Sequence, residues 1–406
     1  MSKRYPGGYI FRSNPTIVGP TIGEGGSAPG IWTLEQASYY TNLGTWPKPI
    51  LPKALYTWGK NDYGQLGQNI DYAITRSSPV QVGAETTWLS TSGGYSHVLG
   101  TKTDKTLWSW GGNTNGQLGQ NNRVNRSSPV QVGALTNWVK IACGRQHSLA
   151  VRDNGTLWGW GLGTSGQLGQ SSNTTRSSPV QVGSETTWLN LVAGYYSSAG
   201  IKTDGTLWSW GMNAHGQLGV GDKIGYSSPV QVGGLTDWAS GAMGRQFTVA
   251  VKTDGTLWAW GWNIYGQLGI DNTIDKSSPV QVGALTNWSS VFAGSAFALS
   301  VKTDGTLWAW GFNESGQLGQ NDRVYRSSPV QIGSLSTWAK VACYRNGVLA
   351  VKTDGTLWSW GNNSVGQLGQ NIAYSTRRSS PVQVGALTSW KNVFAGDQVS
   401  MALRTS

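Results

Sequence analysis

The chain has 406 residues, of which 58 are glycine and only 12% are charged. Its 23 tryptophans, 15 tyrosines and 6 phenylalanines exclude a disordered chain, because disordered chains lack the apolar surface needed to build a core. The formal net charge of +11 favours anionic partners, although no run of five like charges forms a polybasic tail. The sequence contains no secretory signal and no apolar run long enough for a membrane span. We therefore expect a chain made in the cytoplasm, with no membrane insertion.

The first 54 residues differ in composition from the rest of the chain. They hold seven of the fourteen prolines, together with many glycines and serines. This composition predicts an extended arm over residues 1–54. A capping-box pattern that starts at Thr33 predicts a short helix near residues 33–40. We expect the arm to anchor the protein in an assembly, with Trp32, Leu34 and Trp46 as candidate anchoring residues.

Residues 55–406 consist of seven repeats. Gly-Gln-Leu-Gly recurs seven times, first at a spacing of 52 residues and then at 50, and Ser-Ser-Pro-Val-Gln recurs in step with it. Each repeat offers four short candidate strands, such as 138–143, 148–152, 156–161 and 179–183. This period with four strands is typical of one blade of a β-propeller. The sequence therefore predicts an all-β, seven-bladed β-propeller over residues 55–406, preceded by the extended arm.

The two ends of the repeat region complement each other. The last residues match the second strand of a repeat, but the chain stops before the Leu-Trp-Ser-Trp-Gly strand that should follow. Residues 54–59 supply that missing strand. We predict that the ring closes by pairing of these N- and C-terminal strands, because a closed ring has no open sheet edge at the seam.

Three recurring features predict how each blade is built. Twenty of the 23 tryptophans fall in three columns of the repeat, which indicates an inter-blade core. Asp-Gly precedes most Leu-Trp strands and predicts a hairpin turn in which both residues have positive φ. Lys202, just before one such turn, is expected on the solvated surface with a weak pairing to Asp204. Cys143 and Cys343 share one column and are expected to be buried thiols that cannot meet.

The loops of the predicted blades suggest where a partner would bind. Successive loops of an antiparallel blade alternate between two faces, and the loop sequences vary between repeats on one face only. Aromatic residues and arginines are preferred in interface hot spots, so we predict a recognition surface on the variable face. The alternative is that each of these residues is an ordinary loop position. The candidates are Tyr95, Arg145, Tyr195, Arg245, Arg345, Trp262, Phe312 and Tyr325.

A basic residue precedes the Ser-Ser-Pro-Val-Gln segment in six of the seven repeats, and Tyr226 takes its place in the other. This candidate basic ring has two interpretations: binding of phosphates or acidic sugars, or hydrogen bonding to carbonyls of the adjacent loop. Its members are Arg76, Arg126, Arg176, Lys276, Arg326 and Arg378.

The sequence does not indicate catalysis. The three histidines, His97, His147 and His215, are single residues placed in the variable loops, and no spacing typical of metal ligands or of a phosphate-binding loop occurs. The acidic residues lie mainly in the repeated turns rather than in a cluster suited to acid–base chemistry. We therefore predict no enzyme, no catalytic residue, no metal and no cofactor.

The repeat unit, with Leu-Trp-Ser-Trp-Gly, Gly-Gln-Leu-Gly, Ser-Ser-Pro-Val-Gln-Val and Thr-Asp-Gly-Thr in order, resembles that of the regulator-of-chromosome-condensation family. The resemblance spans residues 55–406 and implies a seven-bladed propeller. Family members include an exchange factor for the GTPase Ran, chromatin binders and a secreted bacterial β-lactamase inhibitor. No acidic or wedge-forming insertion matches in the loops of this chain, so we do not expect exchange activity on a Ran-like GTPase.

Three segments of the arm, at 6–10, 30–37 and 44–47, are similar to a module of structural proteins of tailed, especially marine, bacteriophages. This second resemblance implies a multicopy virion protein, associated with the tail or capsid. The arm would bind other virion proteins, and the propeller would recognise a glycan or protein of the host surface. The alternative is an intracellular regulatory propeller in the cytoplasm that binds a protein or a nucleic acid, of which nucleic acid is the less expected.

Overall fold

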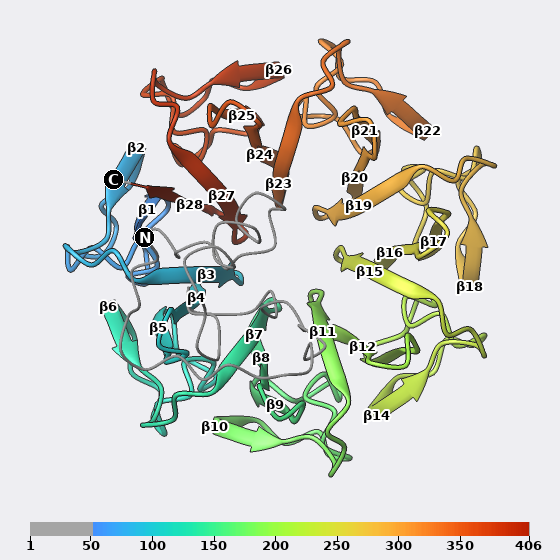
Figure 1. Ribbon diagram of the computed structural model, residues 1–406, viewed down its shortest axis with the longest axis horizontal. Coiled ribbons are helices and arrows are strands. Elements are labelled where there is room, and N and C mark those ends of the chain that lie inside the picture. The colour runs from blue at the N-terminus through green and yellow to red at the C-terminus, as the bar shows by residue number, and fades with distance from the viewer. Residues whose placement is uncertain (1–51, 406) are drawn as a thin grey trace, which may run out of the picture. The chain divides into compact units, whose positions relative to one another are not determined.

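The computed structural model describes residues 52–405, which form 28 β-strands and contain no helix. The strands make seven four-stranded antiparallel sheets arranged in a ring (Figure 1). The predicted fold, a seven-bladed all-β propeller, is confirmed. The expected arm, its helix near 33–40 and the anchoring residues Trp32, Leu34 and Trp46 lie outside the described residues. None of the described residues belongs to a helix that could cross a membrane.

Each blade contains four strands that follow one another from the axis outwards (Figure 1). The innermost strands are β27 (Trp390–Ala395), β3 (Trp88–Gly93), β7 (Trp138–Cys143), β11 (Trp188–Ala193), β15 (Trp238–Met243), β19 (Trp288–Ala293) and β23 (Trp338–Tyr344). The second strands are β28 (Val399–Thr405), β4 (His97–Lys102), β8 (His147–Arg152), β12 (Ser197–Lys202), β16 (Phe247–Lys252), β20 (Phe297–Lys302) and β24 (Gly347–Lys352).

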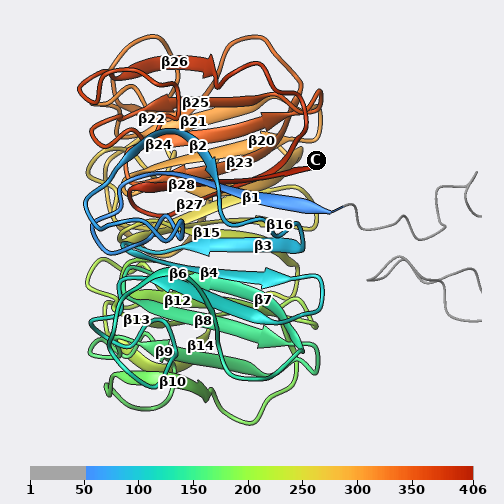
Figure 2. The same ribbon diagram turned by 90° about the vertical axis from the view of Figure 1, so that its left-hand side faces the viewer.

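The two outer layers complete the blades. The third strands are β1 (Lys53–Gly59), β5 (Leu107–Gly111), β9 (Leu157–Gly161), β13 (Leu207–Gly211), β17 (Leu257–Gly261), β21 (Leu307–Gly311) and β25 (Leu357–Gly361). The outermost strands are β2 (Arg76–Gln81), β6 (Arg126–Gln131), β10 (Arg176–Gln181), β14 (Tyr226–Gln231), β18 (Lys276–Gln281), β22 (Arg326–Gln331) and β26 (Arg378–Gln383). All strands run between the two faces of the ring, where the loops lie (Figure 2).

The outermost strands begin earlier than the sequence predicts. The strand expected at 179–183 is β10, which starts at Arg176 and ends at Gln181. Its pairing with β9 shifts register between Arg176 and Val180, and Pro179 lies inside this irregularity. Proline cannot donate to a ladder and is accepted on edge strands at such positions, so the strand continues through it.

The closing blade is built from both ends of the propeller region. Its sheet has the order β2-β1-β28-β27. Lys53 to Gly59 pair without interruption with Thr405 to Val399. The predicted closure is therefore confirmed, and the seam is a full antiparallel ladder.

Tryptophans connect neighbouring blades, as predicted. The indole Nε1–H of Trp110 donates to the carbonyl of Gln65 in the preceding blade (3.1 Å), and all seven tryptophans of this column make the equivalent bond. Its acceptor is always the glutamine of Gly-Gln-Leu-Gly, while the leucine that follows, such as Leu66, is fully buried. The repeated tetrapeptide therefore joins each blade to the next one.

The Asp-Gly turn and the lysine before it differ from the predictions. Gly205 has a φ of 78°, whereas Asp204 is not among the positive-φ residues, so the turn is a three-residue loop with one left-handed glycine. The Asp204 carboxylate accepts hydrogen bonds from the amide and the hydroxyl of Thr206.

Lys202 is buried, and its Nζ lies 3.6 Å from the centroid of the Trp208 ring. The expectation of a solvated lysine was wrong, because its ammonium group stacks on the indole.

Candidate binding face

The seven blades surround a depression at one end of the axis, and each contributes one rim residue from the loop between its first and second strands. We call this depression of about 210 Å³ the mouth. Its floor consists of residues at the ends of the innermost strands, such as Ala193 and Cys343. The rim residues, in order around the ring, are Tyr95, Arg145, Tyr195, Arg245, Ser295, Arg345 and Asp397. Five of the predicted binding residues are therefore brought together here.

Main-chain hydrogen bonds hold the rim loops against one another. The close approach depends on the glycine that precedes six of the seven rim residues, since a Cβ at Gly144 would overlap the carbonyl oxygen of Gly194. Five bonds link adjacent loops: Tyr95 N to Arg145 O (3.0 Å), Arg245 N to Ser295 O (3.0 Å), Ser295 N to Arg345 O (3.1 Å), Arg345 N to Asp397 O (3.4 Å) and Asp397 N to Gly94 O (2.9 Å). The side chains of the rim consequently stand on a rigid frame.

Arg145 organises the aromatic side of the mouth. Its guanidinium carbon lies 5.3 Å from the ring centroids of both Tyr95 and Tyr195, and 5.4 Å from that of Tyr196. It also donates a hydrogen bond to the Tyr196 hydroxyl. Arg245 lies 5.7 Å from the Tyr195 ring. These cation–π contacts fix the tyrosines and leave the arginine charges at the mouth.

Tyr195 and Asp397 connect opposite sides of the rim. They belong to blades three apart, the greatest separation in a ring of seven. The Tyr195 hydroxyl donates to Oδ1 of Asp397 at 3.0 Å. Burial raises the pKa of the Asp397 carboxyl, against the opposing effects of the Tyr195 hydrogen bond, Arg345 and Arg145. Burial and the Asp397 charge raise the pKa of Tyr195 as well.

The other three predicted binding residues form a separate aromatic cluster on the same face, in the loops between third and fourth strands. Tyr265 connects them: its ring centroid lies 5.3 Å from Trp262, 4.9 Å from Phe312 and 5.5 Å from Tyr325. The Tyr325 hydroxyl donates to Oε1 of Glu314 at 2.8 Å. The sequence-predicted residues therefore form two sites rather than one surface, because two different loop sets carry them.

Comparison with protein-family models identifies the architecture. The RCC1-like domain model matches residues 53–343, and two models of the regulator of chromosome condensation (RCC1) repeat match residues 338–367 and 354–403. The chain belongs to the RCC1-like domain family. The resemblance to regulator-of-chromosome-condensation repeats is thereby confirmed, whereas no comparison supports the bacteriophage resemblance of the arm, whose residues lie outside the described part of the chain.

Solved structures share the RCC1-like fold at low sequence identity. Prp20p of Saccharomyces cerevisiae, a protein with binding properties toward Gsp1p and histones, superposes with a TM-score of 0.79 at 21% identity, over 88% of this chain and 92% of that one. Yeast RCC1 (Prp20) bound to Kap60 gives a TM-score of 0.78 at 20% identity, over 88% of this chain and 90% of that one. Human WBSCR16 gives 0.78 at 20% identity, over 87% and 99%. At this level of identity the likeness concerns the fold alone.

A curated sequence relative matches a short stretch. A bifunctional serine/threonine-protein kinase/NEDD4-like E3 ubiquitin-protein ligase of Dictyostelium discoideum is 34% identical over 70 residues. That stretch covers 16% of this RCC1-like chain and 4% of the larger protein.

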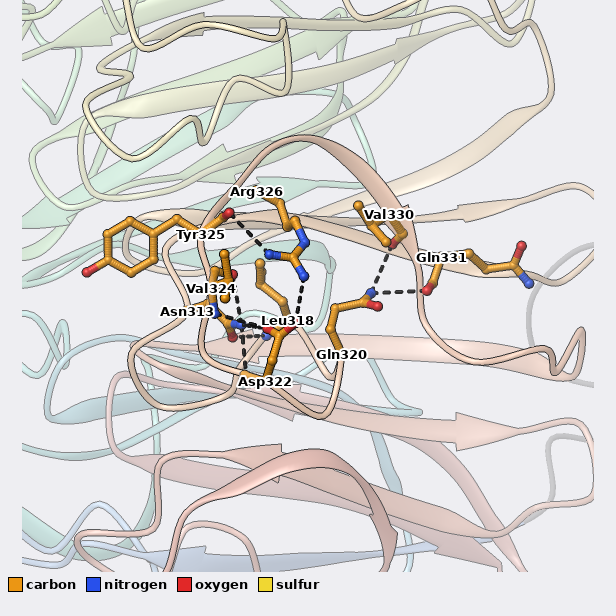
Figure 3. A network of polar contacts seen from close by, with 9 residues as sticks. All are labelled: Asn313, Leu318, Gln320, Asp322, Val324, Tyr325, Arg326, Val330 and Gln331. Carbon is orange, nitrogen blue, oxygen red and sulfur yellow. Dashed lines mark hydrogen bonds and ion pairs between the residues drawn. The ribbon is translucent and has the colours of Figure 1, made fainter.

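The candidate basic ring lies at the circumference of the RCC1-like propeller, at the first residues of the outermost strands (Figure 1). Arg326 donates to the Asp322 carboxylate at 2.6 Å and reaches the Tyr325 carbonyl at 3.5 Å, within a loop that Asn313 holds together (Figure 3). Arg378 donates to the Gln370 side chain at 3.3 Å. For these two residues the loop-supporting interpretation fits the observed contacts.

Two histidines predicted in variable loops are strand residues instead. His97 and His147 begin β4 and β8 and are fully buried. Their Nε2 atoms lie 3.1 Å and 2.9 Å from the hydroxyls of Ser148 and Ser198. Burial lowers the pKa of each imidazole to about 3. Within residues 52–405, no group of three or more His, Cys, Asp or Glu residues could hold a metal ion.

Proposed function

We propose that this chain is a regulatory, protein-binding propeller without catalytic activity, which acts in the cytoplasm and docks its partner on the mouth. The observation that carries the proposal is the rim, where three arginines and two tyrosines from five of the seven blades surround one depression. Arginine and tyrosine are the side chains most enriched in binding hot spots. The main-chain hydrogen bonds between rim loops hold these loops in place before binding, which reduces the conformational entropy lost when a partner binds.

The charge of the mouth favours an acidic partner surface. Arg145, Arg245 and Arg345 line the mouth together with one carboxyl group, that of Asp397. Complementary charge across an interface accelerates association and selects partners, so a basic partner would be disfavoured. The remaining positive charge gives weaker support to nucleic-acid binding, because the basic ring is spread over separate outermost strands rather than along one continuous stripe.

The fold adds support for a protein partner. Yeast RCC1 (Prp20) has been seen bound to Kap60, and Prp20p has binding properties toward Gsp1p and histones. We extend only the class of ligand, a protein, to this chain. The virion role rests on residues of the arm alone and is not part of the proposal.

The test compares three baits: the wild-type chain, the variant Arg145→Ala/Arg245→Ala/Arg345→Ala, and a control with Leu135→Ser and Leu285→Ser in the exposed loops of the opposite face. Equal melting temperatures establish that all three are folded. We expect a partner, with Gsp1p as the first defined probe, to bind the wild type and the control but not the arginine variant, whereas histones, which are basic, should not bind at the mouth. Binding that survives loss of all three arginines contradicts the proposal.

A further inference from the structure

The mouth carries more positive charge than its own groups neutralise. Three guanidinium groups and one carboxylate leave a net charge of about +2 if Asp397 is ionised. The side chains of Arg245 and Arg345 are exposed, and neither donates a hydrogen bond within residues 52–405. Ser295, a short residue, stands between them on the rim. The mouth therefore includes two arginine side chains whose N–H groups donate no hydrogen bond to the described residues.

The mouth already contains one carboxyl group of its own, that of Asp397. Tyr195 holds Oδ1 of Asp397, while the buried Oδ2 has no hydrogen-bond partner among the described residues. Arg345 and Arg145 are close enough to oppose the rise in the pKa of this carboxyl. One carboxylate is therefore present beside three guanidinium groups, and it compensates only one of them.

We propose that the mouth binds a phosphomonoester, presented as a phosphorylated serine or threonine side chain of the partner. This inference rests on the proposed function, because it names the group that the partner inserts. A phosphomonoester carries a charge of about −1.5 to −2 at neutral pH, which matches the excess of about +2. Its three terminal oxygens can accept from several arginine forks at once, in the bidentate geometry that guanidinium groups favour.

Other anions match the mouth less well. A carboxylate side chain would compensate only one of the two uncompensated guanidinium groups. The phosphodiesters of a nucleic acid carry a single charge each and extend along a backbone, whereas the mouth is one isolated depression of about 210 Å³. The charge and the shape of the site both favour one doubly charged group on a narrow side chain.

The first experiment measures binding of N-acetyl-O-phosphoserine amide to the full chain by calorimetry, with the N-acetylglutamate analogue and a short single-stranded oligonucleotide as comparison probes. We expect one phosphoserine bound per chain, about tenfold more tightly than glutamate. Arg245→Ala and Arg345→Ala should each weaken phosphoserine binding about tenfold. Arg123→Ala, at an exposed position of the loop between β5 and β6, is the matched control and should leave the affinity unchanged.

A second variant tests the role of the internal carboxylate. Asp397→Asn keeps a side chain that can accept from Tyr195 but removes the negative charge, so phosphoserine should bind about tenfold more tightly than to the wild type. This gain in affinity cannot result from partial unfolding. Unchanged or weaker binding by a folded Asp397→Asn variant would overturn the proposed charge balance.

The inference fails if phosphoserine does not bind saturably, if glutamate or the oligonucleotide binds as tightly, or if both arginine variants retain full affinity. Phosphatase treatment of a captured partner separates this failure from failure of the proposed function. A partner that needs the three arginines but still binds after dephosphorylation overturns the phosphomonoester and leaves the protein-binding function standing. A partner that binds without the arginines contradicts the function itself.

Discussion

Tyr344 and Gly347 are a large and a small residue in the reverse order of the equivalent pair Gly244 and Phe247 in another blade. A glycine takes the place of Tyr344 in the other six blades, followed three residues later by a ring in blades such as the one with Gly244 and Phe247. A Cβ at Gly347 would overlap the Tyr344 phenol, just as a Cβ at Gly244 would overlap the Phe247 ring. One aromatic ring therefore fills this space from either position.

This exchange predicts strong coupling between the two positions. Gly347→Phe places two rings in one space and should lower the free energy of unfolding by about 1–3 kcal/mol or more. Tyr344→Gly leaves a cavity and should cost about 3–5 kcal/mol. The double variant Tyr344→Gly/Gly347→Phe restores the arrangement of Gly244 and Phe247 and should recover most of the loss. Urea denaturation of all four proteins measures the coupling, and additive losses would contradict it.

The buried histidines predict a pH dependence of stability. Ser198 donates its hydroxyl proton to the Gln167 carbonyl at 2.8 Å, so it accepts from the Nε2–H of His147. The buried Nδ1 has no hydrogen-bond partner among the described residues, which favours the neutral imidazole. The pKa is about 3 in the folded chain and about 6.5 when unfolded, so the unfolded state binds more protons below pH 6.5. The contribution of the neutral, buried histidines to the free energy of unfolding is therefore complete above pH 6.5. It decreases towards pH 3, by at most about 1.4 kcal/mol per pH unit for each histidine.

The matched variant for this measurement is His147→Phe/Ser198→Ala, which copies the Phe247 and Ala298 pair of another blade. Its unfolding free energy should depend less steeply on pH between 6.5 and 5 than that of the wild type. The remaining slope should come from His97, whose pKa is lowered in the same way. Equal slopes for the two proteins would show that His147 does not titrate on unfolding.

The repeated part of the sequence predicts the fold because each position of the repeat occupies the same kind of environment in all seven blades. The spacing of Gly-Gln-Leu-Gly and the strand supplied by residues 54–59 were enough to predict seven blades and their closure. Variation in the column of His97 predicts a loop position, yet this variation reflects paired packing: His97 lies against Ser148, whereas Phe247 and Ala298 are an apolar pair at the same positions. A comparison of the two columns together could have shown this.

The candidate site was predicted in part. The loop set of Arg145 was correctly grouped, since each blade places this position at the axis. The bond between Tyr195 and Asp397 joins blades three apart, and no local pattern reports such a contact. The sequence does not predict that Trp262 lies away from the mouth. Alternation of the loops shows which face a loop is on, but it does not determine how far that loop lies from the axis.

The lysine that stacks on tryptophan predicts an asymmetric response to substitution. Lys202 Nζ lies 3.6 Å from the Trp208 centroid and 2.5 Å from a carboxylate oxygen of Glu185. Lys202→Gln should lower the unfolding free energy by about 1–2 kcal/mol, because a desolvated cation–π contact is lost. Lys202→Arg should be tolerated, since Arg152 lies 3.7 Å from Trp158 at the same position of another blade. Thermal unfolding compares the three proteins, and equal losses for Gln and Arg would contradict the cation–π interpretation.

The closing blade predicts that the last strand is essential for solubility. Deletion of residues 399–406 removes β28, which separates β27 from β1 and pairs with both. The two strands left behind expose unpaired main-chain groups on facing edges, and such edges pair with other chains. We expect the truncated protein to aggregate in sedimentation and size-exclusion measurements, whereas removal of Ser406 alone should have no effect. A soluble truncated protein that unfolds cooperatively would show that the ring holds together without this ladder, because the contacts between neighbouring blades would then be sufficient.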